Sequence, residues 1–396
     1  MNILVINSGS SSIKFQLIQM PSKTLICSGL VERIGEKDAI LNYKTDIVNL
    51  KKTHPIKNHN DGLTRVVNLL LDVDKGVIKN TDEIAIVGHR VVHGGNSFSN
   101  TTLITEDVKG QIGEFAALAP LHNPNNLIGI EVAEALFPNA KQAAIFDTAF
   151  FQTLPEKAKK YAIPNELYKK HKIQVYGFHG TSHKFVSEKA IQYLKLKTSK
   201  IITIHLGNGC SMTAVVDGKS VDHNLGFTPS NGLIMGTRSG DIDHAIVFYL
   251  VNSLGYSLEK VNTLLNKESG MYGLTGYSDL RDIQAQAEKG NEDCQLALAM
   301  NAYRIKKYIG AYVAAMNGLD AIVFTAGIGE NSSVIRAMVC ENMDYFGIEI
   351  DKSINELRSS EIREINTSSA KTKVLVIPTN EELEIAKQAY NLVNSL

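Results

Sequence analysis

Short runs of apolar, often β-branched residues recur along the chain and predict strands. The runs are Ile3–Ile6, Ile13–Ile18, Ile84–Val87, Gln142–Phe146, Ile201–Ile204, Met212–Val216, Ala321–Thr325 and Lys373–Ile377. Between them, apolar residues spaced three and four apart predict helices over Asn126–Phe137, Gln295–Met316 and Val334–Phe346. This alternation of strands and helices is typical of α/β proteins with mixed sheets.

The first predicted hairpin, residues 3–18, is echoed halfway along the chain by residues 201–216. In each copy an apolar strand ends in a turn rich in Gly, Ser and Asn, and an alternating strand follows. Gly9 matches Gly207, so the offset is 207 − 9 = 198, half of the 396 residues. Such turns leave backbone N–H groups that suit phosphate oxygens, although two ordinary hairpins would have the same pattern. The chain therefore contains a duplicated hairpin.

The last predicted helix has the clearest start signal. Thr379-x-x-Glu382 fits a capping box, and an apolar stripe follows it. Capping explains Glu382 but leaves Glu381 without that role, and an extra carboxylate in a first turn usually complements the helix dipole. Asn317 and Gly318 predict the end of the helix before the strand at 321–325.

Composition limits the class of protein. A chain of 396 residues that is 44% hydrophobic is long enough for two or three domains. Lys+Arg and Asp+Glu number 41 each, so no global field attracts nucleic acid or an anionic membrane. The four cysteines have no zinc-ligand spacing, and neither a signal peptide nor a membrane span is evident. We therefore expect reduced thiols and a cytoplasmic protein; the cysteines are Cys27, Cys210, Cys294 and Cys340.

Two polar groups follow predicted strands in the first half of the chain. Arg90 lies between the strand at 84–87 and a glycine turn, where a lone arginine is often only a surface ion pair. Asp147 follows the strand at 142–146, where it could cap a helix or act as a base or an orienting acceptor. The sequence alone leaves both alternatives open.

Two further loops carry candidate chemistry in the second half. His179 lies between glycines in the segment 176–183, and Arg238 lies among small residues in the segment 235–243. Arg suits such a place because its planar fork binds phosphoryl or carboxylate oxygens and stays charged. Two arginines, a histidine and a carboxylate form a plausible set for phosphoryl transfer. The loop 326–332, between a strand and a helix, suits a nucleotide, although neither GxGxxG nor a Walker A motif is present.

Five of these segments together resemble the acetate kinase family of the acetate and sugar kinase/Hsp70/actin superfamily. They are residues 7–14, 88–95, 207–209, 236–241 and 327–331. The resemblance implies an α/β protein with two domains of duplicated ribonuclease H-like (actin-like ATPase) topology and mixed sheets. The first domain would comprise residues 1–147 plus 381–396, and the second, residues 148–380, would carry most of the nucleotide site.

The resemblance also implies an activity and its partners. Members of the family transfer the γ-phosphoryl group of ATP reversibly to acetate, which gives acetyl phosphate and ADP by direct in-line transfer. They need Mg²⁺, for which Mn²⁺ substitutes, and they form homodimers whose domains close over a cleft. No nucleic acid or membrane partner is expected.

Residue by residue, the resemblance places Asn7 and Glu381 at the Mg²⁺ site. The nucleotide-binding residues would be Lys14, His205, Leu206, Gly207, Asn208, Gly209, Asp279, Leu280, Arg281, Gly327, Ile328, Gly329, Glu330 and Asn331.

The catalytic residues follow from the same resemblance. Arg90 would hold the acetate carboxylate, with Asp147 as the acidic catalytic residue. His179 and Arg238 would stabilise charge on the phosphoryl group in flight, and His122 would support the site.

A small apolar cup would hold the acetate methyl group; the family pattern places Val92, Leu121, Phe178 and Pro229 there. We expect Val92, which is branched, to crowd an added methylene, so that propionate is a poor but not an excluded substrate. The sequence departs from the family at Ser230-Asn231 and at His244, which flank the Arg238 loop. Because of these departures, the sequence alone does not predict whether the Arg238 loop is as rigid, or the dimer contacts the same, as in the family.

Three other functions compete with an acetate kinase. A propionate or butyrate kinase of the same fold would differ only in its acyl preference. An actin- or Hsp70-like nucleotide-gated binding protein would share the duplicated core, but it would not need a small-anion site. An inactive scaffold is disfavoured because every position implied by the resemblance is filled.

Overall fold

The structure, a computed structural model, describes residues 1–120 and 122–396. The chain divides into two compact units, which are described separately. Unit 1 comprises Met1–Phe150 and Asn380–Leu396, and unit 2 comprises Phe151–Thr379. These bounds differ by a few residues from the predicted domains, 1–147 plus 381–396 and 148–380, so the predicted domain boundaries stay a prediction.

Unit 1 is built on one mixed sheet with the strand order β5-β4-β3-β2-β1-β6-β8-β7. Its strands are β1 (Asn2–Ser8), β2 (Ser12–Gln19), β3 (Thr24–Glu32), β4 (Ile40–Lys44), β5 (Asn49–Thr53), β6 (Ile84–Val91), β7 (Thr102–Leu103) and β8 (Lys141–Phe146). Its helices are α1 (His59–Leu70), α2 (Glu106–Glu114), α3 (Asn123–Leu136) and α15 (Glu381–Asn394).

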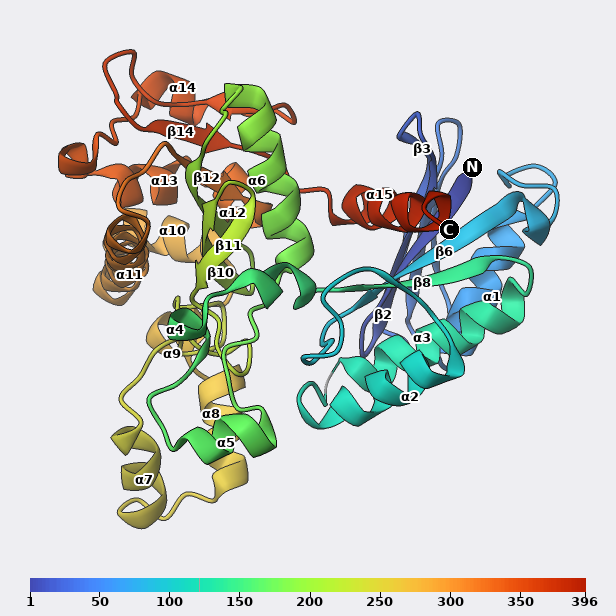
Figure 1. The fold of residues 1–396 in the computed structure, drawn as a ribbon, viewed down its shortest axis with the longest axis horizontal. Helices are drawn as coiled ribbons and strands as arrows, with labels where there is room; N and C mark the ends of the chain where they lie inside the picture. Colours follow the sequence, from blue (N-terminus) through green and yellow to red (C-terminus); the bar gives the residue numbers. More distant parts are fainter. Residues whose placement is uncertain (121) are drawn as a thin grey trace. The chain divides into compact units, whose positions relative to one another are not determined.

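Both faces of this sheet are covered, because alternate residues of β1 point to opposite sides. Leu4 and Ile6 belong to a core with α1 and α3, whereas Ile3 and Val5 pack against α15. Figure 1 shows α15, in red, beside the blue strands from the start of the chain. The end of the chain thus completes unit 1, where α15 packs against β1, β2, β6 and β8.

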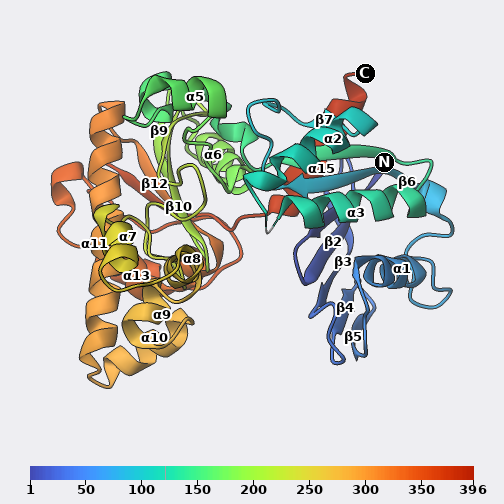
Figure 2. The same ribbon diagram turned by 90° about the horizontal axis from the view of Figure 1, so that it is seen from below.

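Unit 2 has a second mixed sheet with the order β11-β10-β9-β12-β14-β13. Its strands are β9 (Lys200–Leu206), β10 (Cys210–Val216), β11 (Lys219–His223), β12 (Ala321–Thr325), β13 (Arg363–Glu364) and β14 (Lys373–Val376). Its helices are α4 (Glu156–Lys159), α5 (Asn165–His171), α6 (Gly180–Leu194), α7 (Ala245–Asn252), α8 (Leu258–Lys267), α9 (Gly270–Thr275), α10 (Leu280–Glu288), α11 (Glu292–Met316), α12 (Ala326–Asn331), α13 (Ser333–Cys340) and α14 (Lys352–Glu356). Helices α6 and α11 lie on opposite sides of β9 and β12 (Figure 2).

The two sheets repeat one arrangement of five strands. In unit 1 the order is β3-β2-β1-β6-β8, and in unit 2 it is β11-β10-β9-β12-β14. In each, the first two pairs are antiparallel and the strands that follow are parallel to the central one. The predicted hairpins are the antiparallel pairs β1–β2 and β9–β10. The predicted mixed α/β fold is confirmed.

Three local predictions are wrong. The helix predicted over Val334–Phe346 ends at Cys340, and a separate 3-10 turn covers Asp344–Phe346. The predicted loop at 326–332 is largely helix α12. The chain passes from β12 into this helix at Ala326, whose backbone is left-handed (φ 64°). The capping residue of α15 is Asn380, not Thr379: the Asn380 side chain accepts a hydrogen bond from the Leu383 N–H at 2.9 Å.

The long helix α11 ends at Met316 with Asn317 in a left-handed cap, as predicted. None of the described helices is long and apolar enough to cross a membrane. All four cysteines are free and buried, and burial raises the pKa of Cys27, Cys210 and Cys340 to about 12, which disfavours the thiolate form.

Candidate active site

In unit 1, β6 and β8 bring Arg90 and Asp147 together. The strands are parallel neighbours, so residues at their carboxyl ends lie side by side. Arg90 donates from Nη2 and Nε to one carboxylate oxygen of Asp147 at 2.6 and 3.1 Å, and from Nε to the other at 3.2 Å. Burial alone would lower the pKa of Arg90, but the charges of Asp147 and Glu381 outweigh it and raise the pKa. The guanidinium is therefore a fixed cation.

The start of α15 adds carboxylates to the same region of unit 1. Lys14 on β2 pairs with Glu382, its Nζ 2.6 Å from Oε1. The Glu381 side chain makes no hydrogen bond or ion pair with the part of the chain that the structure describes. Burial raises the pKa of the Glu381 carboxyl group, the charge of Arg90 lowers it, and those of Asp147 and Glu382 raise it further. A carboxylate in this setting would be stabilised by an added cation.

These residues fit a Mg²⁺ ion that also binds substrate phosphates. Asn7 on β1 is directly opposite Lys14 on β2, which contacts the start of α15. Amide and carboxylate oxygens are ligands that Mg²⁺ accepts, and it often takes only one or two carboxylates from the protein. No cluster of three or more His, Cys, Asp or Glu suited to a metal occurs among residues 1–120 and 122–396. Asn7 and Glu381 would thus supply part of a coordination shell.

The other predicted residues of unit 1 lie on the loops after β6 and before α3. Val92 is buried, and its N–H donates to Asn126 Oδ1 at 3.0 Å. His122 occupies the position before α3, where its side chain does not cap the helix. Leu121, predicted for the acetate cup, lies outside the described residues.

In unit 2, His179 lies at the start of α6 in the left-handed backbone region, with φ 60°. A non-glycine residue in that region costs about 1 kcal/mol, and such strain is common at functional sites. The imidazole Nδ1 is 2.8 Å from Ser211 Oγ, and the ring stacks on His205 at a centroid distance of 4.5 Å. Phe178, just before it, is buried and donates its N–H to His223 Nε2 at 3.2 Å. These contacts hold His179 in one orientation.

Arg238 lies beside His179 across the glycine turn of the β9–β10 hairpin. A Cβ atom at Gly209 would be 3.4 Å from His179 Nε2 and 3.9 Å from Arg238 Nη1. Arg238 donates to the Pro229 carbonyl at 2.8 Å and pairs with no carboxylate in the described chain. Burial lowers the pKa of Arg238. A partly buried guanidinium with no acidic partner is suited to an anionic ligand.

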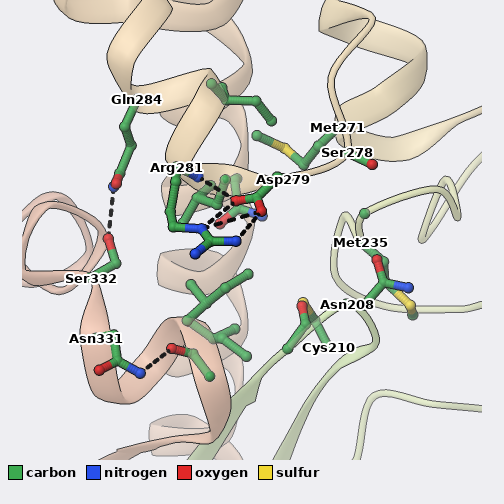
Figure 3. A pocket seen from close by; sticks show the side chains of 18 of the residues that line it. Asn208, Cys210, Met235, Met271, Ser278, Asp279, Arg281, Gln284, Asn331 and Ser332 are labelled. Atoms are coloured by element: carbon green, nitrogen blue, oxygen red, sulfur yellow. Dashed lines mark hydrogen bonds and ion pairs between the residues drawn. The ribbon is translucent and has the colours of Figure 1, made fainter. Parts of the chain in front are cut away.

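A cavity of ≈ 710 Å³ opens in unit 2 close to these residues. Nine of the predicted nucleotide-binding residues line it: Leu206, Gly207, Asn208, Asp279, Leu280, Arg281, Gly327, Ile328 and Asn331. Figure 3 shows the bidentate pair between Arg281 and Asp279, with Nη2 2.6 Å from Oδ2, and the hydrogen bond from Gln284 to Ser332. The volume and the mixed polar lining suit a nucleotide.

Five predicted nucleotide-binding residues do not line this cavity. His205 is buried behind His179, and Gly209 faces His179 and Arg238. Gly329 packs against β9 and β12, while the Glu330 carboxylate accepts from the Thr379 N–H at 3.0 Å. The fifth, Lys14, belongs to unit 1.

Sequence reasoning missed several residues that line the cavity. They are Cys210, Ile234, Met235, Gly236, Met271, Ser278, Ile283, Gln284, Asn301, Ser332 and Arg358. Met235 and Gly236 belong to the segment that includes Arg238, so proximity in sequence was a usable signal. Cys210 and Ser332 likewise belong to segments that the sequence analysis had named, and Ile234 precedes the Arg238 segment directly. The others come from distant segments with no motif of their own.

The departures from the family pattern have defined contacts. Ser230 Oγ donates to Asn266 Oδ1 at 2.7 Å, and Asn231 lies close to Gly226. His244 precedes α7 without a side-chain cap and is exposed. Ser230 therefore ties the segment before Arg238 to the end of α8.

Comparison with known proteins shows the family to which the chain belongs. The sequence pattern of the acetokinase family matches residues 2–387. The chain is 63% identical to the acetate kinase of Flavobacterium johnsoniae over 395 residues, which covers 100% of both chains. It is 42% identical to the Porphyromonas gingivalis acetate kinase crystal structure, with a TM-score of 0.94 and 99% of each chain covered. A propionate kinase from Francisella tularensis is also 42% identical, with a TM-score of 0.93 and 98% and 99% covered. The chain belongs to the acetokinase family.

Proposed function

We propose that this chain transfers the γ-phosphoryl group of ATP reversibly and directly to acetate, giving acetyl phosphate and ADP. The observation that carries the proposal is Arg238, a partly buried guanidinium with no carboxylate partner in the described chain, beside His179 and a nucleotide-sized cavity. Likeness to acetate kinases over the whole chain supports the choice of acetate.

Electrostatics is the main difficulty of this reaction. Acetate is already a nucleophile at neutral pH, so no strong base is required, but two anions must approach each other. Arg238 and a donor at His179 Nε2 would stabilise the charge of the phosphoryl group in the transition state. Both side chains are held in place before substrate binds, so little reorganisation is needed.

Arg90 and Asp147 would act on acetate. Asp147 engages Nε and Nη2 of Arg90, so Nη1 remains for the acetate carboxylate. In this role Asp147 fixes the guanidinium and does not need to move a proton. His122 and the cup residues Val92, Phe178 and Pro229 would surround the small acyl group.

The cavity of unit 2 would hold the adenine nucleotide, with Lys14 directed at its phosphates. Asn7 and Glu381 would hold Mg²⁺, or Mn²⁺ in its place, and the bound metal would neutralise phosphate charge. Glu381 fits this role because burial raises its pKa and it has no ion-pair partner in the described residues.

Trapping of acyl phosphate with hydroxylamine tests the proposal. ATP, Mg²⁺ and acetate, propionate or butyrate are supplied in separate reactions, with Arg90→Ala as the matched variant. We expect a strong acetate signal that Arg90→Ala abolishes. A signal only with a longer acid would transfer the assignment to a propionate or butyrate kinase, and no acyl phosphate from any acid would refute a kinase of this class.

Acyl preference is expected to depend on Val92. One methylene is worth about 1–3 kcal/mol in an apolar pocket. Val92→Ala should therefore raise kcat/KM for propionate relative to acetate about tenfold. If the ratio of kcat/KM for propionate to kcat/KM for acetate is the same in wild type and Val92→Ala, another residue limits the length of the acyl chain.

We also propose a cytoplasmic homodimer, with no nucleic acid or membrane partner. Helix α7 supports the dimer, because none of its residues is buried while Phe248 is 61% and Tyr249 59% exposed. Such an apolar surface on a folded chain usually marks an interface. Light scattering should give twice the chain mass for wild type and one chain mass for Phe248→Asp, and a monomeric wild type would contradict the dimer.

A further inference from the structure

The segment that carries Arg238 is closed at its base by two hydrogen bonds. The Asp241 N–H donates to the Gly232 carbonyl at 3.0 Å, and the Gly232 N–H donates to Asp241 Oδ1 at 2.7 Å. The two ends of the segment lie so close together that a Cβ atom at Gly240 would collide with the Gly232 carbonyl. Residues 232–241 therefore form one closed loop, the Arg238 loop.

Helix α11 binds both ends of this loop. The Tyr308 hydroxyl donates to Asp241 Oδ2 at 2.6 Å. Arg304 donates from Nη1 to the carbonyls of Gly232 and Asp241 at 2.9 and 3.3 Å. The same nitrogen lies 3.7 Å from the Asp241 carboxylate. Two side chains of one helix thus hold the base of the Arg238 loop.

Helix periodicity explains why these side chains reach the same loop. Asn301, Arg304 and Tyr308 are spaced three and four residues apart, so they share one face of α11. Asn301 Nδ2 donates to the Ile234 carbonyl, also in the Arg238 loop, at 3.1 Å. One face of a helix of 25 residues therefore follows the loop from its base inward.

The tip of the Arg238 loop is attached to other elements. The Ser239 N–H donates to the Leu265 carbonyl on α8 at 3.0 Å. The Ser269 N–H, just before α9, donates to the Thr237 carbonyl at 3.1 Å. These bonds hold the main chain on both sides of Arg238, so the loop is fixed at its tip and at its base by different helices.

Helix α11 also contacts the hairpin on the other side of Arg238. It packs against β9 and β10, and the glycine turn between these strands faces the Arg238 guanidinium. The Gly236 N–H of the loop donates to the Asn208 carbonyl of that turn at 3.1 Å. One helix therefore contacts both the hairpin and the base of the loop. If the base moved away from α11, the loop that carries Arg238 would move relative to the glycine turn.

The hydrogen bond from Tyr308 to Asp241 is suited to this task. A hydroxyl that donates to a carboxylate makes a charge-assisted hydrogen bond, which is about twice as strong as a neutral one. Burial, this hydrogen bond and the charge of Asp241 all raise the pKa of Tyr308. The hydroxyl group therefore keeps its proton at neutral pH and remains the donor.

We propose that Arg304 and Tyr308 are positioning residues for Arg238. By holding the two ends of the loop, they fix the guanidinium relative to the glycine turn. The inference rests on the proposed role of Arg238 in stabilising the phosphoryl group in flight. Neither Arg304 nor Tyr308 lines the nucleotide cavity. Their loss should therefore lower kcat and leave the KM values almost unchanged.

Tyr308→Phe tests the proposal, with Tyr312→Phe as the matched control. Tyr312 lies one turn further along α11, its ring contacts that of Tyr308, and its hydroxyl donates to the Met212 carbonyl at 3.4 Å. We expect kcat of Tyr308→Phe to fall about tenfold, the scale of one lost hydrogen bond. KM for ATP and for acetate should stay within about twofold. Tyr312→Phe should keep kcat within about twofold of wild type.

The double variant Arg238→Ala/Tyr308→Phe shows whether the hydroxyl acts through Arg238. If it does, Tyr308→Phe should change kcat by less than about twofold once the guanidinium is absent. A further tenfold loss in the Arg238→Ala background would overturn the proposal, because Tyr308 would then act independently of Arg238.

Arg304 provides a second test that does not depend on the folding of Tyr308→Phe. Arg304→Ala should lower kcat about tenfold, and Arg304→Lys, which keeps a cationic donor, should stay within about threefold of wild type. Wild-type kcat in Tyr308→Phe, an equal loss in Tyr312→Phe, or equal losses in the two Arg304 variants would overturn the proposal and leave the kinase assignment intact. An inactive wild type would instead refute the proposed function, and this inference with it.

Discussion

Arg90 and Arg238 are both partly buried, but their surroundings give them different energetic roles. Arg90 is locked to the buried carboxylate of Asp147 through Nε and Nη2. Arg238 donates to a main-chain carbonyl and has no acidic partner in the described chain. Removing the Arg90 guanidinium takes away the cation that pairs with the buried carboxylate of Asp147. Removing the Arg238 guanidinium takes no cation from a carboxylate.

Arg238→Ala should therefore separate catalysis from stability. We expect kcat to fall about 10²–10³-fold, the scale of one lost transition-state donor. The free energy of unfolding should change by about 1 kcal/mol or less, because no charge loses its partner. Steady-state kinetics and urea unfolding measure the two effects.

Arg90→Ala is the contrasting variant. It should lose activity and also about 3–5 kcal/mol of stability, because Asp147 loses the guanidinium that neutralises it. Equal stability losses in the two variants would contradict this division of roles.

At the scale of one element, helix α12 depends on a buried arginine outside the cavity. Arg336 on α13 is 1% exposed and donates from Nη1 to the carbonyls of Gly329 and Glu330 at 2.8 and 3.0 Å. It also donates to Asn355 from Nε and Nη2. A positive charge at the carboxyl end of a helix stabilises it, and α12 supplies Gly327 and Ile328 to the cavity.

Arg336→Met should thus weaken nucleotide binding without touching the nucleotide site. Several buried carbonyls would lose their donor, at a cost of about 3 kcal/mol. We expect KM for ATP to rise about tenfold, and KM for acetate to stay within twofold. Arg363→Ala, which removes a more exposed donor to Glu330, should have a smaller effect. The same rise in both KM values would show that Arg336 does not act through α12.

The same element shows what local sequence could and could not predict. The strand before α12, the helix α11 and its cap at Asn317 followed from apolar periodicity and a left-handed cap signal. The cap of α15 did not: Thr379 fits the pattern, but its hydroxyl contacts Ser182, 197 residues away, and Asn380 caps the helix instead. Arg90 and Asp147 were predicted for one site, but their ion pair was not predicted, because it depends on the parallel pairing of β6 and β8.

Tertiary packing also explains why several residues that line the cavity were not predicted from the sequence. Residues such as Ile234, Met271 and Asn301 come from separate loops and helices, and none belongs to a motif. Their contribution depends on tertiary packing, which periodicity does not contain.

At the scale of the whole molecule, both units keep imidazoles neutral in their interiors. In unit 1, burial lowers the pKa of His89 and His93 to about 4. In unit 2, burial lowers the pKa of His223 to about 3 and that of His183 well below its usual range. Unfolding exposes these rings, whose ordinary pKa is about 6.5.

Stability should consequently fall as the pH decreases below about 6.5. In this range the unfolded chain binds protons that the folded chain does not, until the folded pKa values are reached. Each ring adds up to about 1.4 kcal/mol per pH unit to this slope. Above about pH 7 these rings are neutral in both states and contribute no slope.

Urea unfolding between pH 7.5 and 5 measures the effect, with His89→Gln as the control. A glutamine keeps a donor for Gln142, which His89 Nε2 contacts at 2.8 Å, but it does not titrate. The slope of the free energy of unfolding against pH should be smaller in His89→Gln, by the contribution of about one proton. A slope identical to that of wild type would contradict the account of buried neutral histidines.

Formation of ATP from acetyl phosphate and ADP, followed by phosphorus NMR, tests the central claim most directly. The samples are wild type, Arg238→Ala and, as a control, Thr213→Ala, each with Mg²⁺. Thr213 on β10 is fully buried, and its hydroxyl lies 2.8 Å from His223 Nδ1. The account predicts a growing γ-phosphate signal of ATP in wild type and Thr213→Ala, and a rate lower by about 10²–10³ in Arg238→Ala. No ATP from wild type, or an equal rate in Arg238→Ala, would contradict phosphoryl transfer at this site.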